Sequence, residues 1–258
     1  MGKIIVIANQ KGGVGKTTTA INLSACVASL GYRVLVVDMD PQGNTTSGFG
    51  VNRDEAENTI YELLLGEAEV QDCVQQEVFP GLSIIPSNIN LAAAEIELID
   101  VEEKEFLLRN ALEKISGEYD YIFIDCPPSL NVLTINSMCA GDSLLIPIQS
   151  EYYALEGLSQ LLHTQNLIAD RLNDELEIEG IVFTMFDART NLSQQVVDNV
   201  RENLDDSIHI FNSIIPRNVR LAEAPSYGLP IVEYAPESTG ATAYRKLARE
   251  MKAYKAKR

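Results

Sequence analysis

The fold of this chain is decided near its start, by residues 3–19, which read Lys3-Ile4-Ile5-Val6-Ile7-Ala8-Asn9-Gln10-Lys11-Gly12-Gly13-Val14-Gly15-Lys16-Thr17-Thr18-Thr19. The run at 3–8 is apolar and β-branched after its lysine, which predicts a buried strand. A helical pattern follows at 20–30, so the order is strand, glycine loop, helix. Glycines let successive backbone N–H groups turn inward, and the helix adds the positive end of its dipole. The stretch therefore predicts a site for nucleotide phosphates.

Individual side chains in this loop fit defined roles at such a site. Lys16 is expected to reach the β- and γ-phosphates, and the Thr17 hydroxyl is placed to ligate Mg²⁺. Three glycines with a lysine and a threonine at these positions should arise by chance in fewer than about one in a thousand chains of this length. The predicted phosphate contacts are Lys11, Gly12, Gly13, Val14, Gly15, Lys16, Thr17 and Thr18.

The rest of the chain alternates short apolar runs with longer amphipathic stretches. Runs that are apolar at every position are typical of a parallel sheet covered by helices on both faces. The fold class is therefore α/β, a doubly wound and mostly parallel sheet, in a single domain over residues 1–258. Residues 39–81 have only a weak helical period near 60–65 and are expected to leave the sheet. The further strands are expected at 33–38, 82–86, 121–125, 143–148, 178–184 and 208–215.

Carboxylates follow two of these expected strands. The second strand leads into Asp38-Met39-Asp40-Pro41-Gln42-Gly43-Asn44, and the strand at 121–125 ends in Asp125-Cys126-Pro127-Pro128-Ser129. Doubly wound folds bind their ligands at the carboxyl ends of strands. Asp125 is therefore expected to bind Mg²⁺ through water. The alternative for Asp40 is that it only begins a turn.

Composition restricts the other possibilities. The four cysteines, Cys26, Cys73, Cys126 and Cys139, form no C-x-x-C pair, and the two histidines lack metal-binding spacing. No run approaches the roughly 18 apolar residues of a membrane span, and no leader precedes the first strand, so we expect a cytoplasmic protein. The net charge of −17 opposes binding to nucleic acid, although residues 239–258 carry seven bases and one acid.

Several of these segments together resemble one family. Gln10 and Lys11 depart from the general phosphate-loop pattern, and Lys-Gly-Gly-Val-Gly-Lys-Thr is similar to the deviant Walker A motif of the ParA/MinD group. The segments at 38–44 and 125–128 resemble that group's D-x-D-P-Q-G and D-[CT]-P-P motifs. Those at 151–157, 184–192 and 215–226 resemble the Soj-type ParA partitioning ATPases. The resemblance covers essentially the whole chain, and it implies an ATPase that uses ATP and Mg²⁺.

The resemblance also implies roles for residues outside the glycines. Lys11 would reach the ATP of a partner subunit, which implies a face-to-face homodimer in the ATP state. Asp40 would orient the attacking water and help to hold the Mg²⁺ shell. Pro216, Arg217 and Asn218 would lie near the adenine. No strong general base is evident among these residues, so intrinsic hydrolysis is expected to be slow.

Further implied properties concern partners. Arg189 and Arg220 fall where the family has arginines for sequence-independent DNA binding, extended by the basic C-terminal helix, although either arginine could be an ordinary surface ion-pair residue. A ParB-type (Spo0J-like) centromere-binding protein would stimulate hydrolysis and release the nucleoid-associated dimer. One alternative is a MinD-like positioning ATPase docked on membrane through the C-terminal helix, whose apolar side has few large aliphatic residues. Another is a scaffold that binds ATP without hydrolysing it.

Overall fold

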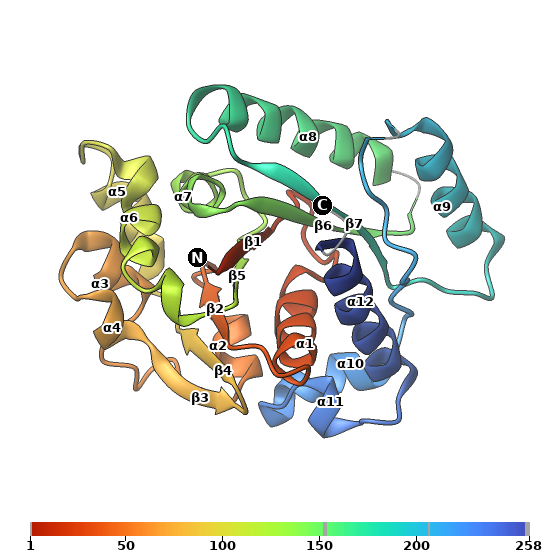
Figure 1. The fold of residues 1–258 in the computed structure, drawn as a ribbon, viewed down its shortest axis with the longest axis horizontal. Helices are drawn as coiled ribbons and strands as arrows, with labels where there is room; N and C mark the ends of the chain where they lie inside the picture. Colours follow the sequence, from red (N-terminus) through yellow and green to blue (C-terminus); the bar gives the residue numbers. More distant parts are fainter. Residues whose placement is uncertain (1, 152–153, 206, 256–258) are drawn as a thin grey trace.

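One seven-stranded sheet organises the chain in the computed structural model, which describes residues 2–151, 154–205 and 207–255. Its strand order is β3-β4-β2-β5-β1-β6-β7, and every neighbouring pair is parallel except β3 with β4 (Figure 1). The predicted α/β doubly wound class is confirmed. The strands are β1 (Lys3–Ile7), β2 (Val34–Asp38), β3 (Gln75–Phe79), β4 (Leu82–Ile85), β5 (Tyr121–Asp125), β6 (Ser143–Gln149) and β7 (Glu177–Thr184).

Helices cover both faces of this sheet because its strands are apolar on both sides. Ile5 and Ile7 of β1 belong to one core cluster, while Val6 belongs to the other. The cluster of Ile5 is completed by α1 (Lys16–Ala28), α10 (Val219–Glu223), α11 (Ile231–Tyr234) and α12 (Thr239–Lys255). The cluster of Val6 is completed by α3 (Ile60–Leu65), α4 (Val70–Cys73), α5 (Leu91–Glu97), α6 (Leu107–Glu113), α7 (Val132–Ala140), α8 (Ala154–Arg171) and α9 (Asn191–Asn203). Shorter pieces are α2 (Asn44–Gly48) and the 3₁₀ turns Lys104–Phe106, Ser116–Glu118 and Ala224–Tyr227.

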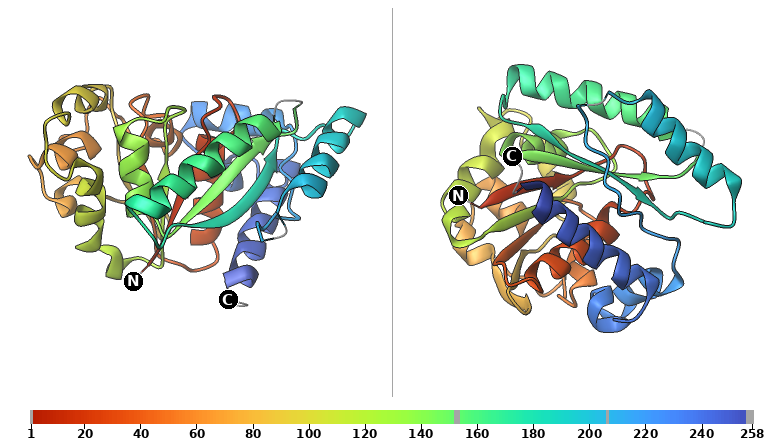
Figure 2. Two further views of the ribbon diagram at one scale, coloured as in Figure 1. Left: turned by 90° about the horizontal axis from the view of Figure 1, so that it is seen from above. Right: turned by 45° about the vertical axis from the view of Figure 1, so that its right-hand side comes forward.

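The register of the three central strands brings their carboxyl ends to one level. In that register Asp125 of β5 lies opposite both Ile7 of β1 and Asp38 of β2. The loops that follow these strands consequently meet at one edge of the sheet, the upper edge in the left view of Figure 2, while the N-terminus lies at the opposite edge. Polar groups placed after these strands are thereby gathered at a single place.

The excursion at 39–81 contains the expected helix at 60–65, but the prediction that all of it leaves the sheet is wrong at β3. This strand reads QQEVF, and its first four residues are exposed or half-buried. It pairs antiparallel with β4 at the edge of the sheet, with an irregular register. An edge strand with so little buried surface needs no apolar pattern, and so the sequence gives no sign of it.

The strand predicted at 208–215 is also not formed, although this segment follows the free edge of β7. They are joined by isolated bridges, at Ile181 with Ile210 and at Phe186 with Pro216, and by a hydrogen bond from Ile215 N to Phe183 O at 2.8 Å. Between these bridges the backbone N–H groups of Asn212 and Ser213 donate to the carboxylate of Glu250 on α12, at 2.6 and 2.9 Å. Since Phe211 N donates to Ile181 O, a regular ladder would next have used the Ser213 amide; the carboxylate of Glu250 takes this hydrogen instead, so the segment remains irregular.

No helix in the described residues is long and apolar enough to cross a membrane. Four charged or aromatic residues of the segments discussed above lie outside the described residues. These are Tyr152 and Tyr153 before α8, and Lys257 and Arg258 of the basic C-terminal run.

Candidate functional site

The phosphate loop connects β1 to α1 and depends on backbone conformations that glycine adopts without strain. Gly13 and Gly15 have φ values of 76° and 86°, in the left-handed region. Gly15 directly precedes Lys16, the first residue of α1, so the amides at the start of this 13-residue helix face the loop. This arrangement gives the predicted strand, glycine loop and helix, with the positive end of the helix dipole at the loop.

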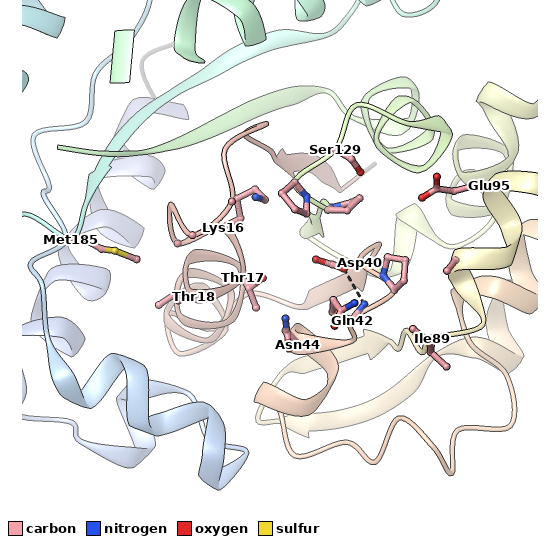
Figure 3. Close-up of a pocket in the computed structure, with 17 residues that line it drawn as sticks. Lys16, Thr17, Thr18, Asp40, Gln42, Asn44, Ile89, Glu95, Ser129 and Met185 are labelled. Carbon is pink, nitrogen blue, oxygen red and sulfur yellow. Dashed lines mark hydrogen bonds between the residues drawn. The ribbon is translucent and has the colours of Figure 1, made fainter. Parts of the chain in front are cut away.

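A cavity of about 610 Å³ opens beside the loop (Figure 3). The loop, the segment after β2, the Pro-Pro segment after β5 and α5 all contribute to its walls. Two of the predicted phosphate contacts, Lys11 and Val14, do not line the cavity; the Val14 side chain is buried, and its carbonyl accepts a 2.7 Å hydrogen bond from Thr184. The predicted residues that line the cavity are Gly12, Gly13, Gly15, Lys16, Thr17, Thr18 and Asp40.

Lys16 is a buried cation at this cavity. It is 7% exposed, and its Nζ donates to the carbonyl of Lys11 at 3.3 Å. Burial lowers the pKa of the Lys16 ammonium, whereas the nearby Asp125 raises it. A cation withdrawn from water in this way interacts strongly with an anion that enters the cavity.

Asp125 lies directly beneath the loop and has one carboxylate oxygen unused. Its Oδ2 accepts hydrogen bonds from the hydroxyls of Thr17, at 2.8 Å, and Thr45, at 2.6 Å. Its Oδ1 is buried and has no hydrogen-bond partner in the described part of the chain. Burial raises the pKa of this carboxyl. A divalent cation would relieve both costs, so the donor set of Thr17 and Asp125 fits Mg²⁺.

The two aspartates after β2 are in different environments. Asp38 is fully buried, and its Oδ2 accepts from the Thr46 amide at 2.8 Å and the Thr46 hydroxyl at 2.7 Å. Burial, then Asp125, raises the pKa of Asp38. Asp40 instead lines the cavity, and its Oδ1 accepts from the Gln42 amide at 2.9 Å. Sequence reasoning gave Asp38 no role, although the D-x-D spacing at a strand end could have indicated that it anchors the segment carrying Asp40.

A second cavity, of about 260 Å³, adjoins the first and shares Gly15, Thr18 and Met185 with it. The predicted adenine residues Pro216, Arg217 and Asn218 all line it. Its walls are largely apolar, as suits a flat base. Sequence reasoning gave no role to the remaining lining residues, although all of them except Tyr244 lie in the segments 184–192 and 215–226 that resemble the family. They are Thr184, Met185, Ile215, Leu221, Ala222 and Tyr244.

The other predicted residues bind acids of the same chain. The Lys11 ammonium lies 2.7 Å from Glu151. The side chain of Arg189 is 86% exposed and forms a bidentate ion pair with Asp187. These hydrogen bonds lower the pKa of the Asp187 carboxyl. Arg220 lies 2.9 Å from Glu223. The two arginines are thus surface ion-pair residues in this structure.

The C-terminal helix α12 divides into a packed side and a basic side. Its apolar residues are in the core and pack beside α1. Lys246, Arg249 and Lys252 are exposed on the other side. The helix therefore offers solvent a basic surface, and five of its apolar residues are covered by packing. The packed residues are Ala243, Tyr244, Leu247, Ala248 and Met251.

Comparisons with known proteins identify relatives of this chain. A family model described as an AAA domain matches residues 2–178. The sporulation initiation inhibitor protein Soj of Bacillus subtilis is 54% identical over 98% of this chain and 99% of its own length. The chromosome partitioning protein ParA of Myxococcus xanthus is 52% identical over 97% of this chain and 88% of its own. A crystal structure of a cobyrinic acid a,c-diamide synthase from Mycobacterium smegmatis, with bound ATP analogue and magnesium, is 34% identical with a TM-score of 0.87, covering 100% of this chain and 98% of that one.

Proposed function

Since this chain belongs to the ParA/Soj family of partitioning ATPases, we propose that it partitions chromosomal or plasmid DNA as a single-domain, nucleotide-switched dimer. The observation that carries this proposal is the gathering of Lys16, Thr17, Asp40 and Asp125 at one edge of the sheet. In the proposed cycle, ATP binding closes two copies face to face, the dimer holds DNA, and slow hydrolysis releases it.

The proposed cofactors are ATP and Mg²⁺. The phosphate tail lies against the loop amides of residues 11–18 and the Lys16 ammonium, while the base occupies the cavity lined by Pro216, Arg217 and Asn218. Thr17 and Asp125 would hold the Mg²⁺, since the Thr17 hydroxyl and the unpartnered Oδ1 of Asp125 are oxygen donors of the kind that this metal prefers. When bound, Mg²⁺ offsets charge on the β- and γ-phosphates.

Hydrolysis in this site is proposed to proceed by positioning and electrostatics. Asp40 orients a water molecule toward the γ-phosphorus, and Lys16 and the loop amides stabilise the charge that develops on the phosphoryl oxygens. Lys11, released from Glu151, adds a further cation to the site of the second copy. No described side chain at the cavity provides a strong base, which supports a slow intrinsic rate that a ParB-type partner increases.

DNA binding is proposed for the dimer through Arg189, Arg220 and the basic side of α12. Each arginine is already charged and exposed, so a DNA phosphate can replace Asp187 or Glu223 as its partner. Because the chain carries −17 overall, binding depends on a local basic surface that dimerisation doubles. This contact would place the protein on the nucleoid. The covered apolar side of α12 speaks against membrane docking.

A mobility-shift experiment tests this function. The chain is mixed with two duplexes of unrelated sequence at low salt, with Mg²⁺ and either ATPγS, ADP or no nucleotide. Equal shifts of both duplexes with ATPγS alone are expected, and the affinity should fall steeply as salt is added. The DNA assignment is abandoned if neither duplex shifts at low salt with ATPγS.

A further inference from the structure

The loop that follows β7 joins both nucleotide cavities to one of the proposed DNA-binding arginines. Met185 lines the first cavity and also the second, which we call the base cavity; Figure 3 shows its side chain on the same side of the first cavity as Thr18. Arg189 lies four residues later, on the surface. Met185 has a φ of 50°, in the left-handed region that methionine rarely adopts. Such a conformation persists only where the surrounding structure fixes it, so the loop is held at the cavity wall.

The residue after Met185 binds the loop to the segment that lines the base cavity. Phe186 N donates to Ile215 O at 3.0 Å, and Arg217 N donates to Phe186 O at 2.9 Å. These two hydrogen bonds flank Pro216, and Arg217 lines the base cavity. Asp187 therefore follows directly after the point where the loop meets the base-binding segment.

Asp187 is close to two arginines and is paired with one of them. Its Oδ1 and Oδ2 accept from Nε and Nη2 of Arg189, at 2.9 and 2.7 Å, and Oδ1 also accepts from the Arg189 amide at 3.0 Å. This pairing lowers the pKa of Asp187, and the nearby charge of Arg217 lowers it further. Among the described residues, Arg217 forms no ion pair. One carboxylate thus neutralises the surface arginine and leaves the charge of the base-cavity arginine uncompensated.

We propose that Asp187 makes DNA affinity depend on nucleotide by exchanging its arginine partner. Without nucleotide it neutralises Arg189, and a neutral pair offers a DNA phosphate little net attraction. A base in its cavity restricts the positions open to the Arg217 side chain, which then pairs with Asp187 and leaves Arg189 for DNA. The exchange costs little, because each exposed ion pair contributes little. This inference rests on the proposed function, since it describes how DNA binding follows the nucleotide.

The test measures the affinity of the full chain for a fluorescein-labelled duplex, without nucleotide and with saturating Mg²⁺-ATPγS. Anisotropy at low salt, titrated to high protein concentration, also measures weak binding. Asp187→Asn keeps an oxygen that accepts from the Arg189 amide but removes the charge. Without nucleotide it should bind DNA about fivefold more tightly than the wild type, the factor that one exposed ion pair allows. With ATPγS the two should agree within about twofold, because Arg189 is already free of Asp187.

Two controls change the net charge equally. Asp198→Asn removes an acid on the neighbouring helix α9 that accepts from the Gln194 side chain, and Glu113→Gln releases Arg109 on α6. Neither should change the ratio of affinities with and without ATPγS. If either control lowers this ratio as much as Asp187→Asn does, net charge alone accounts for the effect and the proposal fails. An equal gain in both nucleotide states for Asp187→Asn would overturn the exchange, because Asp187 would then compete with DNA whatever nucleotide is bound.

Arg217→Gln tests the second partner, at ATPγS concentrations that saturate this variant. DNA binding should weaken about tenfold, since Arg189 then stays neutralised in both copies of the dimer. Adding Asp187→Asn to this variant should restore the affinity, which neither a lost DNA contact nor a damaged base cavity would allow. If the double variant stays weak, Arg217 itself serves the DNA or the base, and the exchange is wrong.

The proposed function and the exchange fail in different ways. If the wild type binds ATPγS but does not bind the duplex, the proposed function is wrong and the exchange is wrong as well. If the wild type binds the duplex with ATPγS while Asp187→Asn behaves like the two controls, the proposed function stands and the exchange alone is wrong.

Discussion

The edge of the sheet beneath the phosphate loop and the arginine-bearing surface after β7 hold their charges in different ways. Lys16 and Asp125 are buried; Asp125 accepts from Thr17 and Thr45, which are far from it in the chain, and its charge opposes the lowering of the Lys16 pKa by burial. Arg189 and Arg220 are exposed and pair with acids two and three residues away. A buried charge requires fixed partners, whereas an exposed ion pair contributes little and exchanges partners readily. The first region is therefore preformed in one chain, and the second acquires its function when the partner of each arginine changes.

The largest expected effect comes from Lys16→Ala, which removes the one predicted phosphate ligand that is a buried cation. Loss of a charge-assisted contact to the triphosphate should weaken ATP binding about 100-fold. Isothermal titration with Mg²⁺-ATPγS measures this. Lys114→Ala is the matched control, because it removes an exposed lysine paired with Glu69 away from the cavity. Unchanged affinity in the Lys16 variant would show that the loop does not bind phosphate as described.

A second large effect should separate binding from chemistry. Asp40→Ala removes the carboxylate proposed to orient water, so turnover should fall about 100-fold while ATP binding persists. Steady-state phosphate release and the titration above measure the two quantities. An ATP-bound dimer should then accumulate. Wild-type turnover in this variant would assign Asp40 only to the turn it forms with Gln42.

The exposed region should give smaller and salt-dependent effects. Arg189→Ala and Arg220→Ala should each weaken DNA binding about tenfold at low salt and reduce the slope of log affinity against log salt by about 1. Filter binding across a salt series provides both numbers. Arg109→Ala, which removes an arginine paired with Glu113 on α6, is the matched control. The comparison between regions breaks down if the control loses as much affinity as either variant.

The smallest expected effect concerns stability without nucleotide. Because burial raises the pKa of Asp125, this group binds a proton more tightly in the folded state than in the unfolded state, so its contribution to stability falls as the pH rises from about 4 towards neutrality. Asp125→Asn lacks this penalty and should be about 1 kcal/mol more stable than wild type near pH 7.5. Thermal melts should show that advantage shrinking towards pH 5. Mg²⁺-ATPγS should stabilise the wild type more than it stabilises Asp125→Asn. If Asp125→Asn without nucleotide is less stable than the wild type at every pH, the prediction is wrong.

The same contrast explains what the sequence could predict. Buried parallel strands carry a continuous apolar pattern, so β1, β2, β5 and β6 were located to within a residue or two, and with them the placement of Asp40 and Asp125. The partly exposed edge strand β3 has no such pattern. The apolar run at 208–215 had the composition of a strand, but Glu250, far along the chain, binds its amides.

Site residues follow a related rule. Those within the loop are neighbours in sequence and form a motif, whereas Met185 and Tyr244 reach the second cavity only through folding. Asp38 is part of the D-x-D spacing, but its hydrogen bonds to Thr46 could not be predicted from the sequence, because they depend on how α2 packs against the strand end. The pairing of Lys11 with Glu151 likewise joins residues that local reasoning does not connect.

The proposed function requires that residues 11–18 wrap the phosphates of Mg²⁺-bound ATP and thereby allow two copies to close on each other. Light scattering on a sizing column, with and without saturating Mg²⁺-ATPγS, tests this most directly. We expect the molar mass to rise from that of one chain to that of two with nucleotide, and only when Lys16 is present. A mass of one chain at saturating nucleotide would contradict the account.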